Sequence, residues 1–172
     1  MPIYALGDLE PTIDATAFVH PEAVIIGDVR IGAGSSIWPC AVLRGDDGPI
    51  TIGNGTSIQD GAVVHTTEES PTQVGDRCVI GHIVHLEGCI VEDDALVGSG
   101  SVVLHRAVVR SWSLVGANAV VPNGMEVPSG AMALGIPAKL RADTVTKEMI
   151  TEGAESYLDR ARRYPTELRR MD

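Results

Sequence analysis

A six-residue period is the feature of this sequence that most constrains its fold. Branched aliphatic residues recur at every sixth position from Ile13, and after short breaks the register resumes at Ile52, Val74 and Val91. The column reads Ile13, Val19, Ile25, Ile31, Ile37, Leu43, Ile52, Ile58, Val64, Val74, Ile80, Leu86, Val91, Val97, Val103, Val109, Val115 and Val121. A period of six matches neither an α-helix nor an alternating hairpin, but it is typical of a solenoid.

Each hexad then supplies one short strand and one corner, and three hexads complete one triangular turn. Small or β-branched residues stand four positions after most of the aliphatic residues, as at Ala17, Val29 and Ala41, where they can fill the remaining interior. Successive turns should pair as parallel strands about 4.8 Å apart. The columns predict six turns of an all-β solenoid.

Composition agrees with a narrow interior and excludes some partners. Hydrophobic residues make up 44% of the chain but aromatic residues only 3%, and there are 19 glycines. The net charge of −10 argues against nucleic-acid binding, and no apolar run approaches the roughly 20 residues of a membrane span. The first residues show no secretory pattern, and three single cysteines suit a cytoplasmic protein.

The pattern changes near the C-terminus. It loosens after Val121, and from about Thr146 the apolar spacing becomes helical, with charges on the opposite face. We expect this helix to end before Pro165, to pack along the solenoid, and to form a tail over residues 143–172 behind a solenoid domain of residues 1–142. Its apolar face is expected to contain Ile150, Ala154, Tyr157, Leu158 and Ala161.

Two insertions interrupt the period after the third hexad of a turn, between Leu43 and Ile52 and between Val64 and Val74. Both loops should therefore leave the same corner of the solenoid. Insertions that share a face often build a binding surface, although a corner that simply tolerates insertions would give the same pattern.

The register also stacks three outward-facing polar residues in one column, Arg44, His65 and Glu87, each directly after a buried aliphatic residue. His82 and His85 stand on the preceding hexad, so we expect these five groups to converge near the loop-bearing corner. A solvated face is the plain alternative, but imidazole and carboxylate together are ligands of zinc and similar metals. His20 and His105 have no such neighbours in the register and are expected to be structural.

Across residues 10–142 the sequence resembles the γ-class carbonic anhydrases and their relatives among hexapeptide-repeat proteins. The motifs that carry the resemblance are Ile26-Gly-Asp-Val, Ser36-Ile-Trp-Pro, Leu43-Arg-Gly-Asp46, Ile58-Gln-Asp-Gly61, Val64-His65, Gly81-His82, Gly88-Cys89 and Leu134-Gly-Ile-Pro-Ala-Lys139. The resemblance implies a left-handed parallel β-helix with a C-terminal α-helix, against the usual right-handed rule for parallel crossovers. It also implies a homotrimer with metal sites at the subunit interfaces.

The resemblance further implies a set of metal ligands. His65 matches the first family ligand, and His82 matches the second, which should reach across the interface. Glu87 stands where the family has its third histidine, and His85 is a substitute at another place on the strand. The implied cofactor is a divalent metal, foremost zinc, with iron or cobalt as alternatives.

Other family positions match more fully. Arg44 and Asp46 match a segment that ties subunits together, while Gln59 and Asp60 match a pair near the metal, where Gln59 could orient water or bicarbonate. The loop after His65 offers Glu68 or Glu69 to move protons.

The implied reaction is reversible hydration of carbon dioxide to bicarbonate by hydroxide on the metal. The changed third ligand predicts weak or absent activity. Two alternatives remain open at this point: a non-catalytic trimeric scaffold, and an acyltransferase or thioester-processing enzyme with His65 or His82 as the base.

Overall fold

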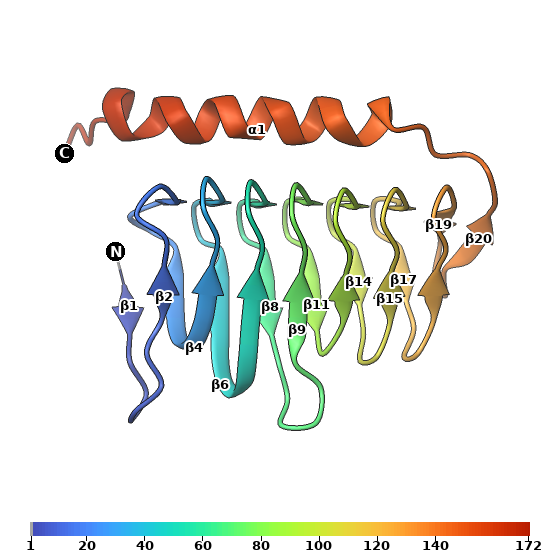
Figure 1. Ribbon diagram of the computed structural model, residues 1–172, viewed down its shortest axis with the longest axis horizontal. Helices are drawn as coiled ribbons and strands as arrows, with labels where there is room; N and C mark the ends of the chain where they lie inside the picture. Colours follow the sequence, from blue (N-terminus) through green and yellow to red (C-terminus); the bar gives the residue numbers. More distant parts are fainter. Residues whose placement is uncertain (1) are drawn as a thin grey trace.

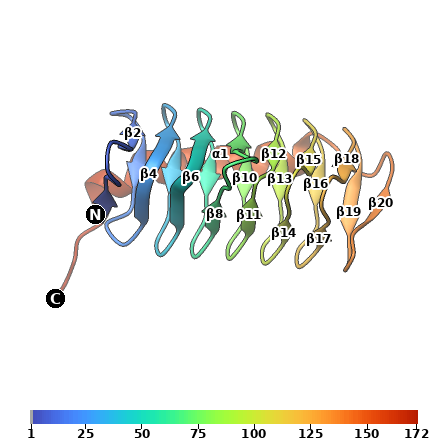
Figure 2. The same ribbon diagram turned by 90° about the horizontal axis from the view of Figure 1, so that it is seen from below.

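The computed structural model describes residues 2–172, which form a parallel β-solenoid of about seven turns with one helix lying along its length (Figure 1). The coils follow one another from end to end without crossing (Figure 2). The predicted fold, a left-handed β-helix of hexapeptide repeats with a C-terminal helix, is confirmed. Helix α1 is too polar to cross a membrane, and the same holds for any helix within the described residues.

The strands form three faces. Strands β4 (Val24–Ile31) and β6 (Val42–Ile52) bend around one corner and belong to two faces. The β8–β11 face adds β1 (Ile3–Tyr4), β8 (Val63–His65), β11 (His85–Glu87), β14 (Val102–Val103) and β17 (Val120–Val121). The β9–β12 face adds β2 (Thr12–Ile13), β9 (Thr72–Val74), β12 (Ile90–Val91), β15 (Val108–Val109) and β18 (Glu126–Val127). The β7–β10 face contains β3 (Phe18–Val19), β5 (Ser36–Ile37), β7 (Ser57–Ile58), β10 (Val79–Ile80), β13 (Leu96–Val97), β16 (Leu114–Val115), β19 (Met132–Leu134) and the antiparallel β20 (Lys139–Arg141).

The predicted aliphatic column forms the core. On the β8–β11 face Leu43 pairs with Val64, Val64 with Leu86 and Leu86 with Val103, and all four side chains are fully buried. Removing these aliphatic groups from water supplies the main stabilisation of the solenoid, because each buried branched side chain contributes about 1.5–3 kcal/mol.

The prediction of six turns is wrong by one turn, because the period continues through Val127 and Ala133, both buried. Pro122 and Pro128 interrupt the sequence pattern. In earlier turns, the residue at the same position donates its backbone N–H to the next turn. Leu104 N, for example, donates to Val121 O at 3.1 Å. The last turns have no complete coil beyond them, so Pro122 and Pro128 forfeit no such bond.

Helix α1 (Glu148–Glu167) runs back along the β7–β10 face, where it contacts β3, β5, β7 and β10 (Figure 1). Tyr164 packs against Phe18 and Trp38, with ring centroids 5.7 Å and 4.8 Å away. The prediction that the helix ends before Pro165 is wrong. Proline removes one hydrogen bond, but the packing of Tyr164 and a bond from Leu168 N to Tyr164 O (2.9 Å) hold the last turn.

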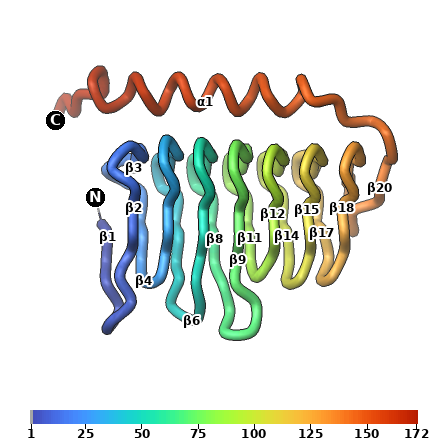
Figure 3. The backbone as a smooth tube through the Cα atoms, in the orientation of Figure 1, coloured from blue at the N-terminus to red at the C-terminus, as the bar shows by residue number. Residues whose placement is uncertain are grey.

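The two insertions lie on one edge of the solenoid, on the side away from α1 (Figure 3). One is the middle of β6, and the other is the loop between β8 and β9, which is closed by a bridge between Thr67 and Ser70. The prediction that both leave one corner is confirmed. This edge forms the corner between the β8–β11 and β9–β12 faces.

Glycine follows the aliphatic residue where a side chain from the next turn needs the space. Asp76 Oδ1 accepts a hydrogen bond from Asn54 N at 2.7 Å, passing directly over Gly53. A Cβ on Gly53 would lie 2.4 Å from that oxygen and 2.5 Å from the carbonyl carbon of Gly75. Asp76 could move aside only by breaking its hydrogen bond with Asn54, and the backbone of Gly75 cannot move in the same way, so glycine is the residue that fits here.

We therefore expect Gly53→Ala to lower the free energy of unfolding by more than about 2 kcal/mol. The matched control is Gly153→Ala on α1, where a Cβ would lie 3.5 Å from Val79 and the helix gains about 1 kcal/mol in propensity. Urea denaturation followed by circular dichroism measures both. Equal stability of the two variants would contradict the steric argument.

Candidate functional site

The outward column predicted from the period lies on strands β6, β8 and β11. Arg44 pairs in register with His65, and His65 pairs with Glu87. Their side chains are partly exposed, whereas Val64 and Leu86 beside them on the same strands are fully buried. The predicted stacking of these three residues is confirmed.

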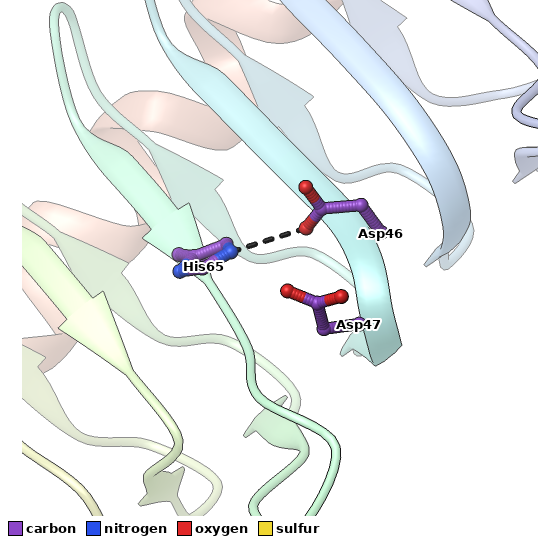
Figure 4. A group of neighbouring side chains, drawn as sticks. All are labelled: Asp46, Asp47 and His65. Carbon is purple, nitrogen blue, oxygen red and sulfur yellow. Dashed lines mark hydrogen bonds and ion pairs between the residues drawn. The ribbon is translucent and has the colours of Figure 1, made fainter.

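His65 lies between two carboxylates. Its Nδ1 is 3.0 Å from Glu87 Oε1. On the other side of the ring, its Nε2 is 3.1 Å from Asp46 Oδ1, the contact drawn in Figure 4. A neutral imidazole has only one N–H, so it can donate to one carboxylate and not to both. The second contact is favourable when His65 carries a second proton, or when a cation lies beside it. The position therefore suits a positive charge.

The carboxylates around His65 favour their ionised forms. Burial raises the pKa of Asp46, but hydrogen bonds, foremost from Arg44, outweigh it and hold that pKa below its usual value. The hydrogen bond with His65 lowers the pKa of Glu87, against the opposing effect of burial. Arg44 also forms an ion pair with Asp46 within the same chain. Two carboxylate charges and one guanidinium charge thus surround the imidazole.

Glu87 also contacts two further histidines. Its Oε2 is 3.2 Å from His85 Nε2, and its Oε1 is 3.8 Å from His105 Nε2. The expectation that His105 has no such neighbours is wrong. His105 belongs to the next coil, and it lies over Gly88, where a Cβ would be 2.8 Å from its ring. The missing side chain at Gly88 thus lets His105 approach the cluster.

Asp47 is a candidate ligand that the sequence reasoning missed. One ligand atom each from Asp46, Asp47 and His65 lies within 4.8 Å of the others, and Figure 4 shows both carboxylates beside the imidazole. The adjacent pair of aspartates was the available signal. Asp47 falls inside an insertion, however, where the six-residue period assigns no position.

A second polar group lies at the opposite end of the β8–β11 face, next to α1. His82 Nδ1 is 3.0 Å from Asp60 Oδ2, and His82 Nε2 is 3.4 Å from the Tyr157 hydroxyl. Gln59 is buried beside Asp60. The expected convergence of five groups is therefore wrong for His82. His82 occupies the corner before β11, whereas Glu87 is at the far end of that strand.

Tyr157 was expected only as part of the apolar helix face, and no sequence signal linked it to His82. Its ring packs edge-on against Trp38 at 5.3 Å, as the helical spacing predicts. Burial raises the pKa of the Tyr157 hydroxyl above its ordinary value. The link to His82 depends on how α1 docks, which the period of the solenoid does not specify.

Comparison with known proteins identifies the family of this chain. The family described as "Bacterial transferase hexapeptide (six repeats)" matches residues 10–45. "Gamma carbonic anhydrase 2, mitochondrial" of Arabidopsis thaliana is 40% identical over 93% of this chain, and "Carnitine operon protein CaiE" of Escherichia coli K12 is 43% identical over 81% of this chain and 71% of its own length. The chain belongs to the γ-carbonic anhydrase-like family of hexapeptide-repeat proteins.

The fold is shared along the whole solenoid. The crystal structure of a hexapeptide transferase family protein from Anaplasma phagocytophilum matches with a TM-score of 0.90 and 39% identity, covering 95% of this chain and 98% of that one. The chain spans only 60% of the length of the Arabidopsis relative.

The residues present fit a divalent metal in their chemistry. Imidazole nitrogen and carboxylate oxygen are zinc ligands and also suit iron and cobalt. Within one chain, the donors gather around His65, with Asp46 and Asp47 on one side and Glu87 on the other. His82 has a partner on Nδ1 that orients its ring, as is usual for a metal-binding histidine.

Proposed function

We propose that this chain is a metal-dependent, γ-carbonic anhydrase-like protein that hydrates carbon dioxide reversibly and slowly near neutral pH. The observation that supports the proposal best is the in-register contact of His65 with Glu87, because Glu87 is the residue to which the resemblance assigns the third ligand position. His65 and Glu87 of one chain and His82 of a neighbouring copy would hold the metal. His85 is the substitute ligand where Glu87 stays paired with His65.

A divalent metal at this position would supply a Lewis acid that lowers the pKa of a coordinated water to about 7. The chain's own residues prepare that site. Asp60 fixes the ring of His82, and Gln59 can donate to water or bicarbonate from its buried position. Arg44 offsets the charge of Asp46 and can also reach a neighbouring copy. The exposed Glu68 and Glu69 lie in the loop after His65, where they can pass protons to buffer.

Glu87 is the reason to expect slow turnover. A carboxylate carries a negative charge that a third histidine would not, so it makes loss of a proton from a nearby water harder. The hydrogen bond from His65 keeps Glu87 ionised, since it lowers the pKa of that carboxyl. At neutral pH a smaller fraction of the molecules would then carry the deprotonated water that reacts with carbon dioxide.

A homotrimer is part of the proposal. The His65 cluster and His82 lie at opposite ends of the β8–β11 face, so one rigid chain cannot bring them together. Exposed apolar side chains accompany this face: Val63 on β8 is 38% exposed, and Ile83, next to His82 at the corner before β11, is 73% exposed. A head-to-tail contact along this face would cover them and close into a ring.

A transferase is the second candidate. The matching family is described as a transferase, and so is the Anaplasma structure. The Asp60–His82 pair offers a general base that needs no metal. A scaffold without turnover is the third candidate, since Glu87 already satisfies His65. Metal content of the purified protein separates the first candidate from the other two.

We infer a reducing compartment, such as the cytoplasm, from the cysteines. Cys40, Cys78 and Cys89 are all free thiols. Burial raises the pKa of both Cys78 and Cys89 to about 12, so these two are unreactive core residues.

The first prediction of this proposal concerns assembly. Sedimentation at micromolar concentration should give the mass of three 18.1 kDa chains, because the metal site is complete only between copies. Ile83→Asp, which places a charge in the exposed apolar patch, should shift the protein towards monomers. Glu155→Gln on α1 is the control and should leave the trimer intact. A monomer that still holds metal would contradict the shared site.

The second prediction concerns metal retention. His65→Ala and His82→Ala should each lose most bound zinc while the unfolding midpoint stays near that of the natural protein, because both side chains lie outside the core. Asp47→Asn is the matched control and should retain zinc. Elemental analysis after dialysis measures the content. Loss in Asp47→Asn with retention in His82→Ala would place the metal within one chain instead.

The third prediction concerns Glu87. Glu87→His should raise the initial rate of carbon dioxide hydration at pH 7 by about tenfold or more, because it removes a negative charge beside the metal. Glu87→Gln removes the same charge but is a poor ligand, so it should lose zinc. Stopped-flow hydration rates and metal content are measured together. High natural activity that Glu87→His reduces would contradict the role given to Glu87.

A further inference from the structure

Helix α1 contacts one of the proposed metal ligands, His82, through the hydroxyl of Tyr157. This hydroxyl is 3.4 Å from Nε2 of His82, whose Nδ1 is 3.0 Å from Asp60. We propose that Tyr157 is a positioning residue that competes with the metal for Nε2 of His82. The inference rests on the proposed function, because it concerns the ligand that His82 supplies to a neighbouring copy.

The direction of the hydrogen bonds follows from the chemistry of the three groups. An ionised carboxylate can only accept, so Asp60 requires the proton of His82 to be on Nδ1. The neutral ring then presents a lone pair at Nε2, and the hydroxyl of Tyr157 donates to it. Asp60 and Tyr157 together select the tautomer in which Nε2 carries a lone pair and no proton.

The same lone pair cannot serve two partners. Nε2 of a neutral imidazole has one lone pair in the ring plane, and it accepts the Tyr157 proton or it binds a metal. Binding of the metal therefore requires the Tyr157 contact to break. The contact at 3.4 Å is longer than the contact with Asp60, so Asp60 orients the ring while Tyr157 adds a weaker hold.

The position of the Tyr157 hydroxyl is fixed by packing. Its ring meets Trp38 edge-on at 5.3 Å, and the guanidinium of Arg160 lies 4.8 Å from the ring centre. Trp38 is itself held by hydrogen bonds from Nε1 to Ser36 (2.9 Å) and Ser57 (3.1 Å). Docking of α1 on the solenoid thus places the competing hydroxyl at His82.

The test compares Tyr157→Phe with Tyr164→Phe in the full chain. Both variants keep an aromatic ring against Trp38, but only Tyr157 reaches His82. Zinc affinity is measured by competition with a chelator. Tyr157→Phe should bind zinc about fivefold more tightly than the natural protein, as expected from removing one neutral hydrogen bond. Tyr164→Phe should leave the affinity unchanged.

A second measurement needs no metal. Nitrogen-15 spectra of the metal-free protein should show the His82 proton on Nδ1, and Tyr157→Phe should shift the Nε2 resonance as its donor disappears. Tyr164→Phe should leave that resonance in place. Because the spectra report on the contact itself, they read out the positioning role separately from zinc binding.

The outcomes separate this inference from the proposed function. Equal or weaker zinc binding by Tyr157→Phe, or a His82 proton on Nε2, overturns the role of Tyr157 and leaves the metal site standing. If none of the three proteins binds zinc, the proposed function fails and the competition fails with it. Tighter binding in Tyr157→Phe alone, together with the shifted Nε2 resonance, supports it.

Discussion

The register between successive coils is the constraint on which the rest of the structure depends. Each coil pairs with the one before it, so that Leu43, Val64 and Leu86 stack in a fully buried column. Side chains alternate between the two sides of a strand, so a slip of one residue would turn Arg44 inward and expose its aliphatic neighbour. Burying such charges without partners costs far more than the slip could recover. The apolar column therefore also fixes the polar column beside it.

A column of stacked side chains places like positions about 4.8 Å apart, so charges in it must be offset locally. The chain meets this requirement with alternating partners. Arg44 pairs with Asp46, Asp46 with His65 and His65 with Glu87. The imidazole of His65 is the one member that faces a carboxylate on each ring nitrogen. A second proton or a cation at this imidazole would contact both carboxylates at once, and His65 is one of the metal ligands that we propose.

Much of this arrangement could be predicted from the sequence, because the period of six fixes position along the solenoid. It placed Arg44, His65 and Glu87 in one column and both insertions at one corner. The period did not predict residues whose positions in the structure depend on insertions or on packing between elements. Asp47 lies in an insertion, and His105 reaches Glu87 only across Gly88. The prolines after Val121 interrupt the period, so the last turn was not predicted. The predicted end of α1 was wrong because packing of Tyr164 against Phe18 and Trp38, and not Pro165, sets it.

The rigidity that makes the column predictable also limits what one chain can do. The His65 cluster and the Asp60–His82 pair occupy the two ends of a face whose strands are fixed by pairing on both sides. His82 precedes β11 and Glu87 ends it, so the paired strand holds the two side chains apart. The two ends can therefore share a ligand only across a contact between copies. Because the two ends differ, such a contact is head-to-tail, and it must close into a ring or continue as a fibre. Ring closure would then make assembly and metal binding a single equilibrium, in which each copy supplies the ligand that its neighbour lacks.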